Sequence, residues 1–299
     1  VVLNDEPVQE FIGYDSLESN IKIVKYRKIN SNKDGIIFQL VFNLTPFYPE
    51  GGGQVGDKGY LEAPNGNVTY ITDTKRENNL IVHYSSTLPV DLNQKLNAEV
   101  DEKQRHKITC NHSATHLMHQ ALRSVLGDHV EQKGSMVHSG MFRFDFSHFA
   151  KLLPEEIIAV EQFVNARIKE QLPLEESRSV PYEKAISSGA IALFGEKYGD
   201  TVRTIRFGHS IELCGGTHVK NTADIWYFKI SSETAVAAGV RRIEAITGED
   251  ALAYFEDRNQ VLEKINFLLK DPQNLPKAVE NIQTENIILK KEIKNSNFS

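Results

Sequence analysis

The segment DEKQRHKITCNHSATHLMHQALRSVLG (residues 101–127) decides the fold class, because the chain changes here from strand-like to helical periodicity. The residues that recur near one side of a helix are Ile108, His112, Thr115, Leu122 and Leu126. This spacing predicts a first long helix that starts near Val100.

The sequence on either side of this helix predicts an α+β fold. From residue 20 to about residue 100, β-branched and aromatic residues alternate between turn signals, which predicts a small antiparallel β-barrel or sandwich. Beyond the helix, strands and helices follow one another without a regular βαβ rhythm as far as Gly248. We therefore expect a β-barrel-like subdomain over residues 1–99, with a glycine-rich loop, and an α+β domain over residues 100–248.

The last segment, residues 249–299, is helical and polar. Apolar residues step by three and four on both sides of Asp271-Pro272, which interrupts the pattern. This predicts a helical hairpin or the start of a coiled coil. Two plain amphipathic helices packed on the preceding domain remain an equal alternative.

Composition narrows the class of protein. The chain has 299 residues and only two cysteines, which favours a reducing compartment, and we expect the cytoplasm. No run approaches the ~20 apolar residues of a membrane span, and the first residues lack a signal-peptide layout. They read as a cut within a longer chain. The net charge of −6 means that any RNA contact should be local.

Two pairs of residues have the spacing of metal ligands. His112 and His116 are displaced by about 40° around a helix and about 6 Å along it, so both rings can reach one point. Cys214 and His218 repeat this spacing around two glycines. Three histidines and one cysteine suit zinc, either structural or catalytic. The alternative is that the histidines are satisfied on the helix face and Cys214 is a small buried residue.

Two neighbouring residues are weaker candidates as ligands. Cys110 falls on the far side of the helix from His112, and we expect it to be buried. His119 lies on the correct face but about 10 Å further along the axis, too far to share an ion with His112. The glutamate of an HExxH motif is absent, so peptide hydrolysis is disfavoured.

Six segments together resemble the editing region of the alanyl-tRNA synthetases, in the order expected for that family. They are TPFYPEGGGQVGDKG (45–59), NHSATHL (111–117), QKGSMV (132–137), ALFGEKYGD (192–200), ELCGGTHV (212–219) and AAGVRRIEAITG (237–248). The resemblance implies zinc at His112, His116, Cys214 and His218. It also implies hydrolysis of tRNA(Ala) that wrongly carries serine or glycine, within a full-length enzyme that ligates alanine to tRNA(Ala) with ATP.

The resemblance also implies roles for four further residues. Thr115 would discriminate serine from alanine, unless its hydroxyl only bonds the preceding turn of its own helix. Gln132 and Ser135 would line the same pocket, although polar turn residues often have no other role. Arg241 resembles an arginine near the site, and Arg242 should point the other way on a strand.

RNA contact would involve the acceptor end of tRNA(Ala). The glycine-rich loop Gly51-Gly52-Gly53-Gln54 is not a P-loop, and only its context favours an RNA-facing role. Basic residues near the predicted site are candidates for the phosphates, or else belong to a solvated face: Lys103, Arg105, Lys107, Lys133, Arg203 and Arg206.

Three functional alternatives remain at this point. The chain is a zinc-dependent deacylase, a tRNA-binding module with a purely structural zinc, or a free-standing alanyl-tRNA editing protein. The absence of a recognisable class II aminoacylation core predicts that the chain does not activate alanine itself. The helical end favours a piece of a full synthetase, which could self-associate through its coiled coil.

Overall fold

The computed structural model describes residues 1–3, 10–31, 35–192 and 198–296. It confirms a mixed α+β architecture and divides into two compact units, Val1–Asp250 and Ala251–Ser299. No helix in these ranges combines the length and the apolar character that crossing a membrane requires.

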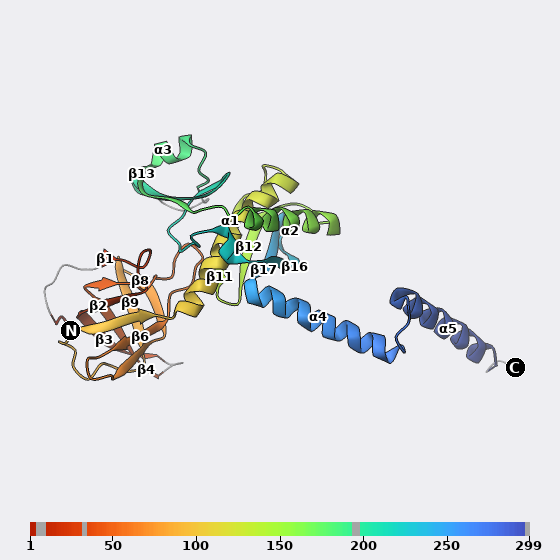
Figure 1. The fold of residues 1–299 in the computed structure, drawn as a ribbon, viewed down its shortest axis with the longest axis horizontal. Coiled ribbons are helices and arrows are strands. Elements are labelled where there is room, and N and C mark those ends of the chain that lie inside the picture. Colours follow the sequence, from red (N-terminus) through yellow and green to blue (C-terminus); the bar gives the residue numbers. More distant parts are fainter. Residues whose placement is uncertain (4–9, 32–34, 193–197, 297–299) are drawn as a thin grey trace. The chain divides into compact units, whose positions relative to one another are not determined.

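The N-terminal part of the first unit consists of two antiparallel sheets around one core (Figure 1). One sheet has the order β2 (Glu18–Ile21), β10 (Leu96–Val100), β6 (Gly59–Glu62), β7 (Val68–Ile71). The other has the order β3 (Ile23–Ser31), β4 (Gly35–Phe42), β9 (Leu80–Ser85), β8 (Asp73–Glu77). Two short strands, β1 (Glu10–Phe11) and β5 (Leu44–Thr45), pair in parallel.

The prediction of a barrel-like subdomain is corrected to an open pair of sheets. In the described residues the outer strands β2, β7, β3 and β8 are sheet edges, and no ladder joins them into a closed barrel. Alternation of apolar and polar residues specifies which face of a strand is buried. It does not encode the edge-to-edge pairing that closes a barrel, so the sequence pattern could not distinguish the two.

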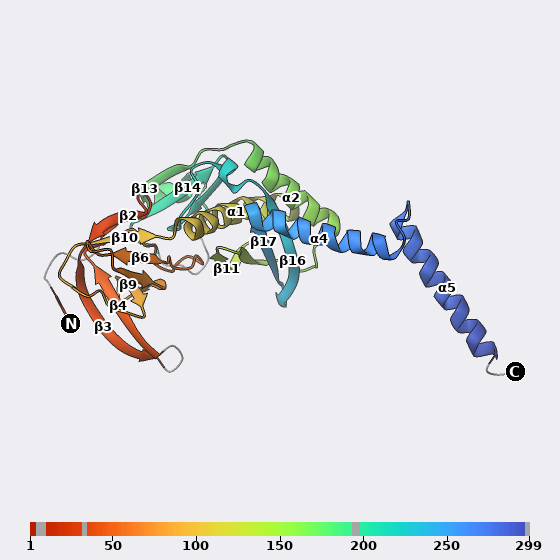
Figure 2. The same cartoon turned by 60° about the horizontal axis from the view of Figure 1, so that its bottom comes forward.

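The predicted long helix is α1 (Glu102–Leu126), and it is the centre of the larger core. Asp101 caps it by accepting a hydrogen bond from the backbone N–H of Gln104 at 3.0 Å. The helix packs on the sheet β11–β12–β17–β16 and beside α2 (Pro154–Lys169), as Figures 1 and 2 show. The strands of this sheet are β11 (Gln132–His138), β12 (Met141–Ser147), β17 (Val240–Thr247) and β16 (Phe228–Ala237).

A third sheet carries the second pair of predicted ligands. It has the order β13 (Glu175–Pro181), β14 (Thr201–Phe207), β15 (Ser210–Leu213), and α3 (Tyr182–Ser187) follows β13. Cys214 comes directly after β15, so the strand delivers the CGGTH loop to the side of α1.

The segment DIWYFKISSETA (224–235) has the composition of a strand, but only its second part is one. Residues 222–225 form a 3₁₀ turn, η1 (Thr222–Ile225), because the side chain of Asn221 accepts a hydrogen bond from the N–H of Ala223 at 2.8 Å. Trp226 then adopts a φ of +63°, and β16 starts only at Phe228.

The second unit contains the helices α4 (Gly248–Leu268) and α5 (Leu275–Ser296). The first residues of α4 belong to the first unit. They are separated at Asp271-Pro272 as predicted, with Lys270 and Asp271 in the left-handed region. The apolar residues that step by three and four, and that would form the contact line of a coiled coil, are not buried in the described structure. Leu262, Ile265, Ile282 and Leu289 are 39–50% exposed. The hairpin or coiled coil is therefore not confirmed.

Candidate functional site

The four predicted ligands converge on one point. A ring nitrogen of His112, His116 and His218 and the sulfur of Cys214 all lie within 4.8 Å of one another. The sulfur of Cys214 is 3.5 Å from Nε2 of His112 and 3.3 Å from Nε2 of His218. The three histidines are buried, at 4–7% exposure, and Cys214 is partly buried. This arrangement of donors can hold a metal ion.

A close approach of the loop to the helix makes the convergence possible. A Cβ atom on Gly216 would lie 2.0 Å from Cε1 of His112, a distance that no side chain tolerates. At Gly215, by contrast, a Cβ atom would meet nothing within 4 Å. Only the second glycine of CGGTH is therefore required by packing.

Hydrogen bonds orient the rings of two of the histidines. Nδ1 of His112 donates to Oε1 of Gln54 at 2.8 Å, and Nδ1 of His218 lies 3.1 Å from the hydroxyl of Ser113. In both rings Nε2 is then left facing Cys214. His116 differs, because its buried Nδ1 has no hydrogen-bond partner in the described structure.

Burial keeps the cluster in the protonation state that metal binding requires. Loss of solvent lowers the pKa of His112 and His218 well below the usual range, and the mutual repulsion of the ring charges lowers it further. The pKa of His116 is also lowered by burial, against the opposing effect of Glu212. All three rings are therefore neutral at physiological pH, with lone pairs available.

Glu212 is a site residue that the sequence analysis missed. Its Oε2 is 3.5 Å from Nε2 of His116 and its Oε1 is 3.0 Å from Nδ1 of His119. Burial alone would raise the pKa of Glu212, but the interactions with the His116 and His119 imidazoles, including a hydrogen bond from His119, lower it overall. The signal was present in the sequence, since residues two apart on a strand share a face and Glu212 stands two before Cys214. His119, set aside as a ligand, thus contacts the carboxylate instead.

The glycine-rich loop contributes directly to the cluster through Gln54. This side chain is fully buried, and its Oε1 accepts from the N–H of Thr217 at 2.9 Å as well as from His112. Its Nε2 donates to the hydroxyl of Thr217 at 2.9 Å. Gln54 therefore ties the loop, helix α1 and the CGGTH segment together. Sequence reasoning gave it no such role.

Two further side chains hold the CGGTH loop from its other side. Arg203 donates to the carbonyls of Cys214 and Gly216 at 2.9 and 2.7 Å, and Tyr14 donates to the carbonyl of Gly215 at 2.6 Å. The guanidinium of Arg203 also stacks 3.9 Å from the centre of the Tyr14 ring and bonds Glu176 at 2.7 Å. The loop backbone is thus fixed at three successive carbonyls.

The predicted catalytic residues lie in different settings. Thr115 is buried, and its hydroxyl donates to the carbonyl of Asn111 at 2.8 Å, as the simpler alternative anticipated. Gln132 and Ser135 are both on β11, where the Gln132 amide donates to the Ser135 hydroxyl at 3.1 Å. Arg241 is ion-paired with Glu233, and none of the described contacts joins it to the ligand cluster.

Strand alternation separates Arg242 from Arg241 as expected. Arg242 pairs with Asp145, whose neighbours Phe144 and Phe146 point to the opposite, buried face. The glycine-rich loop runs beside β11, with Val55 donating to the carbonyl of Val137 at 3.0 Å. A Cβ atom on Gly53 would lie 2.2 Å from the Ser135 hydroxyl, so this loop closes on the predicted pocket residues.

Two of the six predicted phosphate-binding residues are corrected. Arg105 is 5% exposed, and its Nε contacts Asp57 at 2.9 and 3.0 Å, while Arg203 is used as described above. Arg105 faces the neighbouring β-rich part of the first unit, which a helical surface pattern could not reveal. Arg203, on strand β14, is directed to the carbonyls of the CGGTH loop. Lys107 contacts Asp250 at 3.2 Å, Lys133 contacts Glu131 at 2.9 Å, and Lys103 and Arg206 are exposed.

Comparison with known proteins places the chain in a family. Residues 202–244 match the family model described as "Threonyl and Alanyl tRNA synthetase second additional domain". Residues 2–104 match the model described as "tRNA synthetases class II (A)". The second match covers the β-rich N-terminal part of the chain. The expectation that this chain does not itself activate alanine remains a prediction. Residues 193–197 of the resemblance lie outside the described structure.

Curated relatives agree with these matches over nearly the whole chain. An alanine–tRNA ligase of Christiangramia forsetii is 59% identical over 293 residues, which is 98% of this chain and 34% of the relative. Ligases of Flavobacterium psychrophilum and Cytophaga hutchinsonii are 53% and 48% identical, covering 96% and 98% of this chain and 33% of each relative. The chain thus spans about a third of the length of the curated relatives it matches. At this identity and with this coverage of the chain, it belongs to the alanyl-tRNA synthetase family.

Proposed function

We propose that this site hydrolyses the ester bond of tRNA(Ala) that carries serine or glycine in place of alanine. Zinc would be bound by His112, His116, Cys214 and His218. The observation that carries the proposal is the convergence of these four donors within 4.8 Å, in a chain that matches the second additional domain of the threonyl and alanyl synthetases.

The chemistry of the donors and their separations from the Cys214 sulfur support zinc as the ion. Zinc–nitrogen and zinc–sulfur bonds of about 2.0 and 2.3 Å in a tetrahedron imply donor separations of about 3.3–3.6 Å. The two separations from the Cys214 sulfur, 3.5 and 3.3 Å, fall at these values. The neutral rings and the carboxylate of Glu212 behind His116 are the surroundings that such a site requires.

An aminoacyl ester is already reactive, so the chain has mainly to place the substrate and water. When bound, zinc would supply positive charge near the ester. Gln132 and Ser135, which are hydrogen-bonded to one another beside the glycine-rich loop, would orient the substrate amine, its carbonyl or water. Arg241, which is paired with Glu233, would act by positioning that part of the sheet.

Thr115 would provide the discrimination against serine. Its hydroxyl proton is committed to the carbonyl of Asn111, so the oxygen presents lone pairs that can accept from the hydroxyl of a seryl group. An alanyl group offers no such donor, and a buried acceptor left unpaired is penalised. The correct ester would consequently be bound less well than the incorrect one.

The remaining parts of the proposal concern the longer relatives. Because they are named alanine–tRNA ligases, we propose that a full-length enzyme of this kind joins alanine to tRNA(Ala) with ATP in the cytoplasm. The acceptor end of the tRNA would enter this unit. The exposed apolar residues of α4 and α5 would mediate self-association in a longer chain.

A second candidate is a tRNA-binding module whose zinc only holds the fold. Four protein ligands complete a tetrahedral shell, which is typical of structural rather than catalytic sites. A free-standing editing protein is less favoured, because the matching relatives are ligases about three times as long as the aligned segment.

Deacylation of Ser-tRNA(Ala) by zinc-loaded protein tests the proposal. We expect release of serine, little action on Ala-tRNA(Ala), and loss of release in Cys214→Ala. Thr115→Val should fold and bind zinc but lose selectivity. Thr284→Val is the matched control, because Thr284 makes the same hydroxyl bond to a carbonyl four residues earlier, on exposed α5, at 2.8 Å. No serine release at micromolar enzyme concentrations would leave the structural-zinc alternative.

A further inference from the structure

Trp226 is the single tryptophan of the chain, and it is 57% exposed. The residue before it, Ile225, and the second residue after it, Phe228, are fully buried, while its other neighbour Tyr227 is 41% exposed. The two exposed rings, Trp226 and Tyr227, thus lie side by side on the surface between two fully buried residues. The backbone that carries the Trp226 ring is therefore held on both sides by buried residues.

The backbone at Trp226 is strained. Its φ and ψ angles are +63° and −59°, and the N–H of Tyr227 donates to the carbonyl of Ile225 at 2.8 Å across it. This is the γ-turn that is rare for residues with a side chain. Strain of this kind persists only where surrounding packing enforces it, and it concentrates at binding sites. Glycine would adopt this conformation without cost.

A cavity of about 310 Å³ adjoins this ring. It is lined by Trp226 and Thr247 together with Lys103, His106 and Lys107, and by the acidic residues Asp224, Glu249 and Asp250. Lys107 is ion-paired with Glu249 and Asp250, which leaves Lys103 as the cation beside the ring. Lys103 is exposed and forms no ion pair with any residue that the structure describes, so its ammonium group is available to a phosphate. An aromatic face beside such a cation suits a nucleotide, whose base stacks and whose phosphate pairs with the cation.

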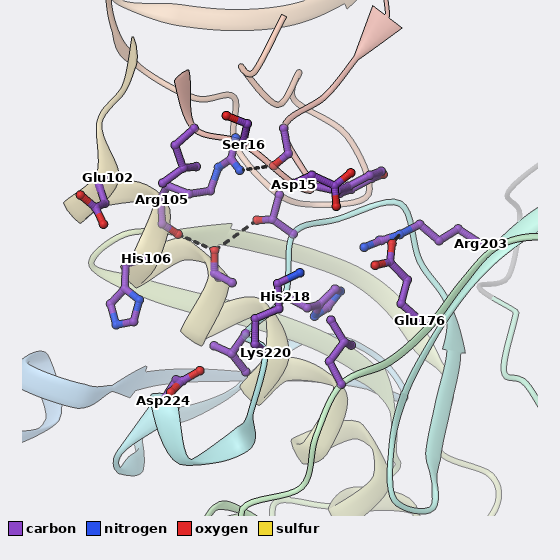
Figure 3. Close-up of a pocket in the computed structure, with 17 residues that line it drawn as sticks. Asp15, Ser16, Glu102, Arg105, His106, Glu176, Arg203, His218, Lys220 and Asp224 are labelled. Atoms are coloured by element: carbon purple, nitrogen blue, oxygen red, sulfur yellow. Dashed lines mark hydrogen bonds and ion pairs between the residues drawn. The ribbon is translucent and has the colours of Figure 1, made fainter. Parts of the chain in front are cut away.

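A neighbouring cavity reaches one of the metal-ligand residues. A second cavity of about 290 Å³ shares His106 and Asp224 with the first and is lined further on by Thr217 and His218. Figure 3 shows His218 with His106 and Asp224 on one side of it and Glu176 and Arg203 on the other. A nucleotide on Trp226 would thus lie next to the space that ends at a ligand histidine.

We propose that Trp226 is a stacking platform for one unpaired base near the end of the RNA substrate, with Lys103 contacting its phosphate. The inference rests on the proposed function, because it assumes that an RNA end approaches this cluster. It assigns a specific nucleotide contact to the turn between η1 and β16. A protein partner on the same ring is the competing outcome of the test.

Intrinsic fluorescence can follow this contact, because no other tryptophan is present in the chain. The protein is titrated with an RNA hairpin that carries an unpaired 3′ extension and with the same hairpin cut to a blunt end. Stacking should quench the emission with the extended RNA only. Equal quenching by both RNAs, or none by either, would overturn the proposal.

Variants measure the contribution of the ring to binding of the labelled extended hairpin. Trp226→Gly should bind about 5- to 100-fold more weakly, as expected for the loss of one stacked base, and should unfold at the same urea concentration or a higher one. Trp226→Phe should bind with intermediate affinity. Tyr70→Ala, which removes another exposed ring, 65% accessible, should bind normally. Unchanged affinity of Trp226→Gly would refute the platform.

Three readouts keep this inference separate from the proposed function. Serine release by the wild type without any RNA-dependent quenching would overturn the stacking proposal alone. Quenching by the extended hairpin without serine release would leave the nucleotide site and remove the deacylase function. Altered sedimentation of Trp226→Gly with unchanged RNA affinity would assign the ring to a protein contact instead.

Discussion

Replacing Gln54 with alanine should weaken both the fold and metal binding. The buried amide accepts from the Nδ1–H of His112 and from the N–H of Thr217, and it donates to the Thr217 hydroxyl. Gln54→Ala leaves two buried N–H groups without a partner, and each costs about 1–3 kcal/mol. We expect the free energy of unfolding to fall by about 2–5 kcal/mol. Loss of such a ligand-orienting bond should also weaken zinc binding about 10- to 100-fold.

Two measurements separate these effects. Urea unfolding of metal-free protein gives the cost to the fold, and competition with a chromogenic chelator gives the zinc affinity. Gln162→Ala, on the exposed part of α2, is the matched control and should change stability by less than about 0.5 kcal/mol. Zinc affinity within twofold of the wild type in Gln54→Ala would refute the reasoning, because the His112 ring would then be oriented without the amide.

Three further predictions follow from buried groups. Burial lowers the pKa of His83 to about 3. Between about pH 3 and 6.5 the unfolded chain therefore binds a proton on this residue that the folded chain does not. The free energy of unfolding falls as the pH drops through that window. Metal-free wild type should therefore lose about 2 kcal/mol more than His83→Gln between pH 7 and 5, measured by urea unfolding; parallel pH profiles would contradict this. Gly216→Ala should abolish stoichiometric zinc in metal analysis through a clash with a ligand ring, whereas Gly215→Ala should retain it. Arg105→Met should lower the free energy of unfolding by about 3–5 kcal/mol, because it leaves Asp57 buried without its partner. Adding Asp57→Asn should restore part of that stability. If the stability losses of the two substitutions simply add in the double variant, the pairing is contradicted.

The local parts of the site were predictable from the sequence, because they depend on spacing within one element. His112 and His116 share a helix face, and Cys214 and His218 share a short loop. That the two pairs meet is a tertiary contact, which we predicted from their equal spacing and matching donor chemistry as well as from the family resemblance. Glu212 could have been added by strand alternation, since it faces the same side as Cys214.

Contacts between distant segments could not be predicted in this way. Gln54 reaches Thr217 across 163 positions, and the pattern around it indicated only a turn. Arg105 was misassigned for a similar reason, because its helix face looks solvated until the β-rich part packs on it. The open arrangement of the two N-terminal sheets could not be predicted for the same reason. Periodicity predicts elements and their buried faces, and edge pairing and docking depend on the whole chain.

The bond network of Gln54 has a consequence for how the protein folds. The ligand cluster needs a loop near residue 54, a helix near residue 112 and a segment near residue 218, so it cannot close early in folding. Contacts between such separated segments require large loops to be ordered first, which slows their formation. During synthesis, all the donors are present only after His218 has left the ribosome. Metal capture would therefore mark the completion of this unit rather than initiate it.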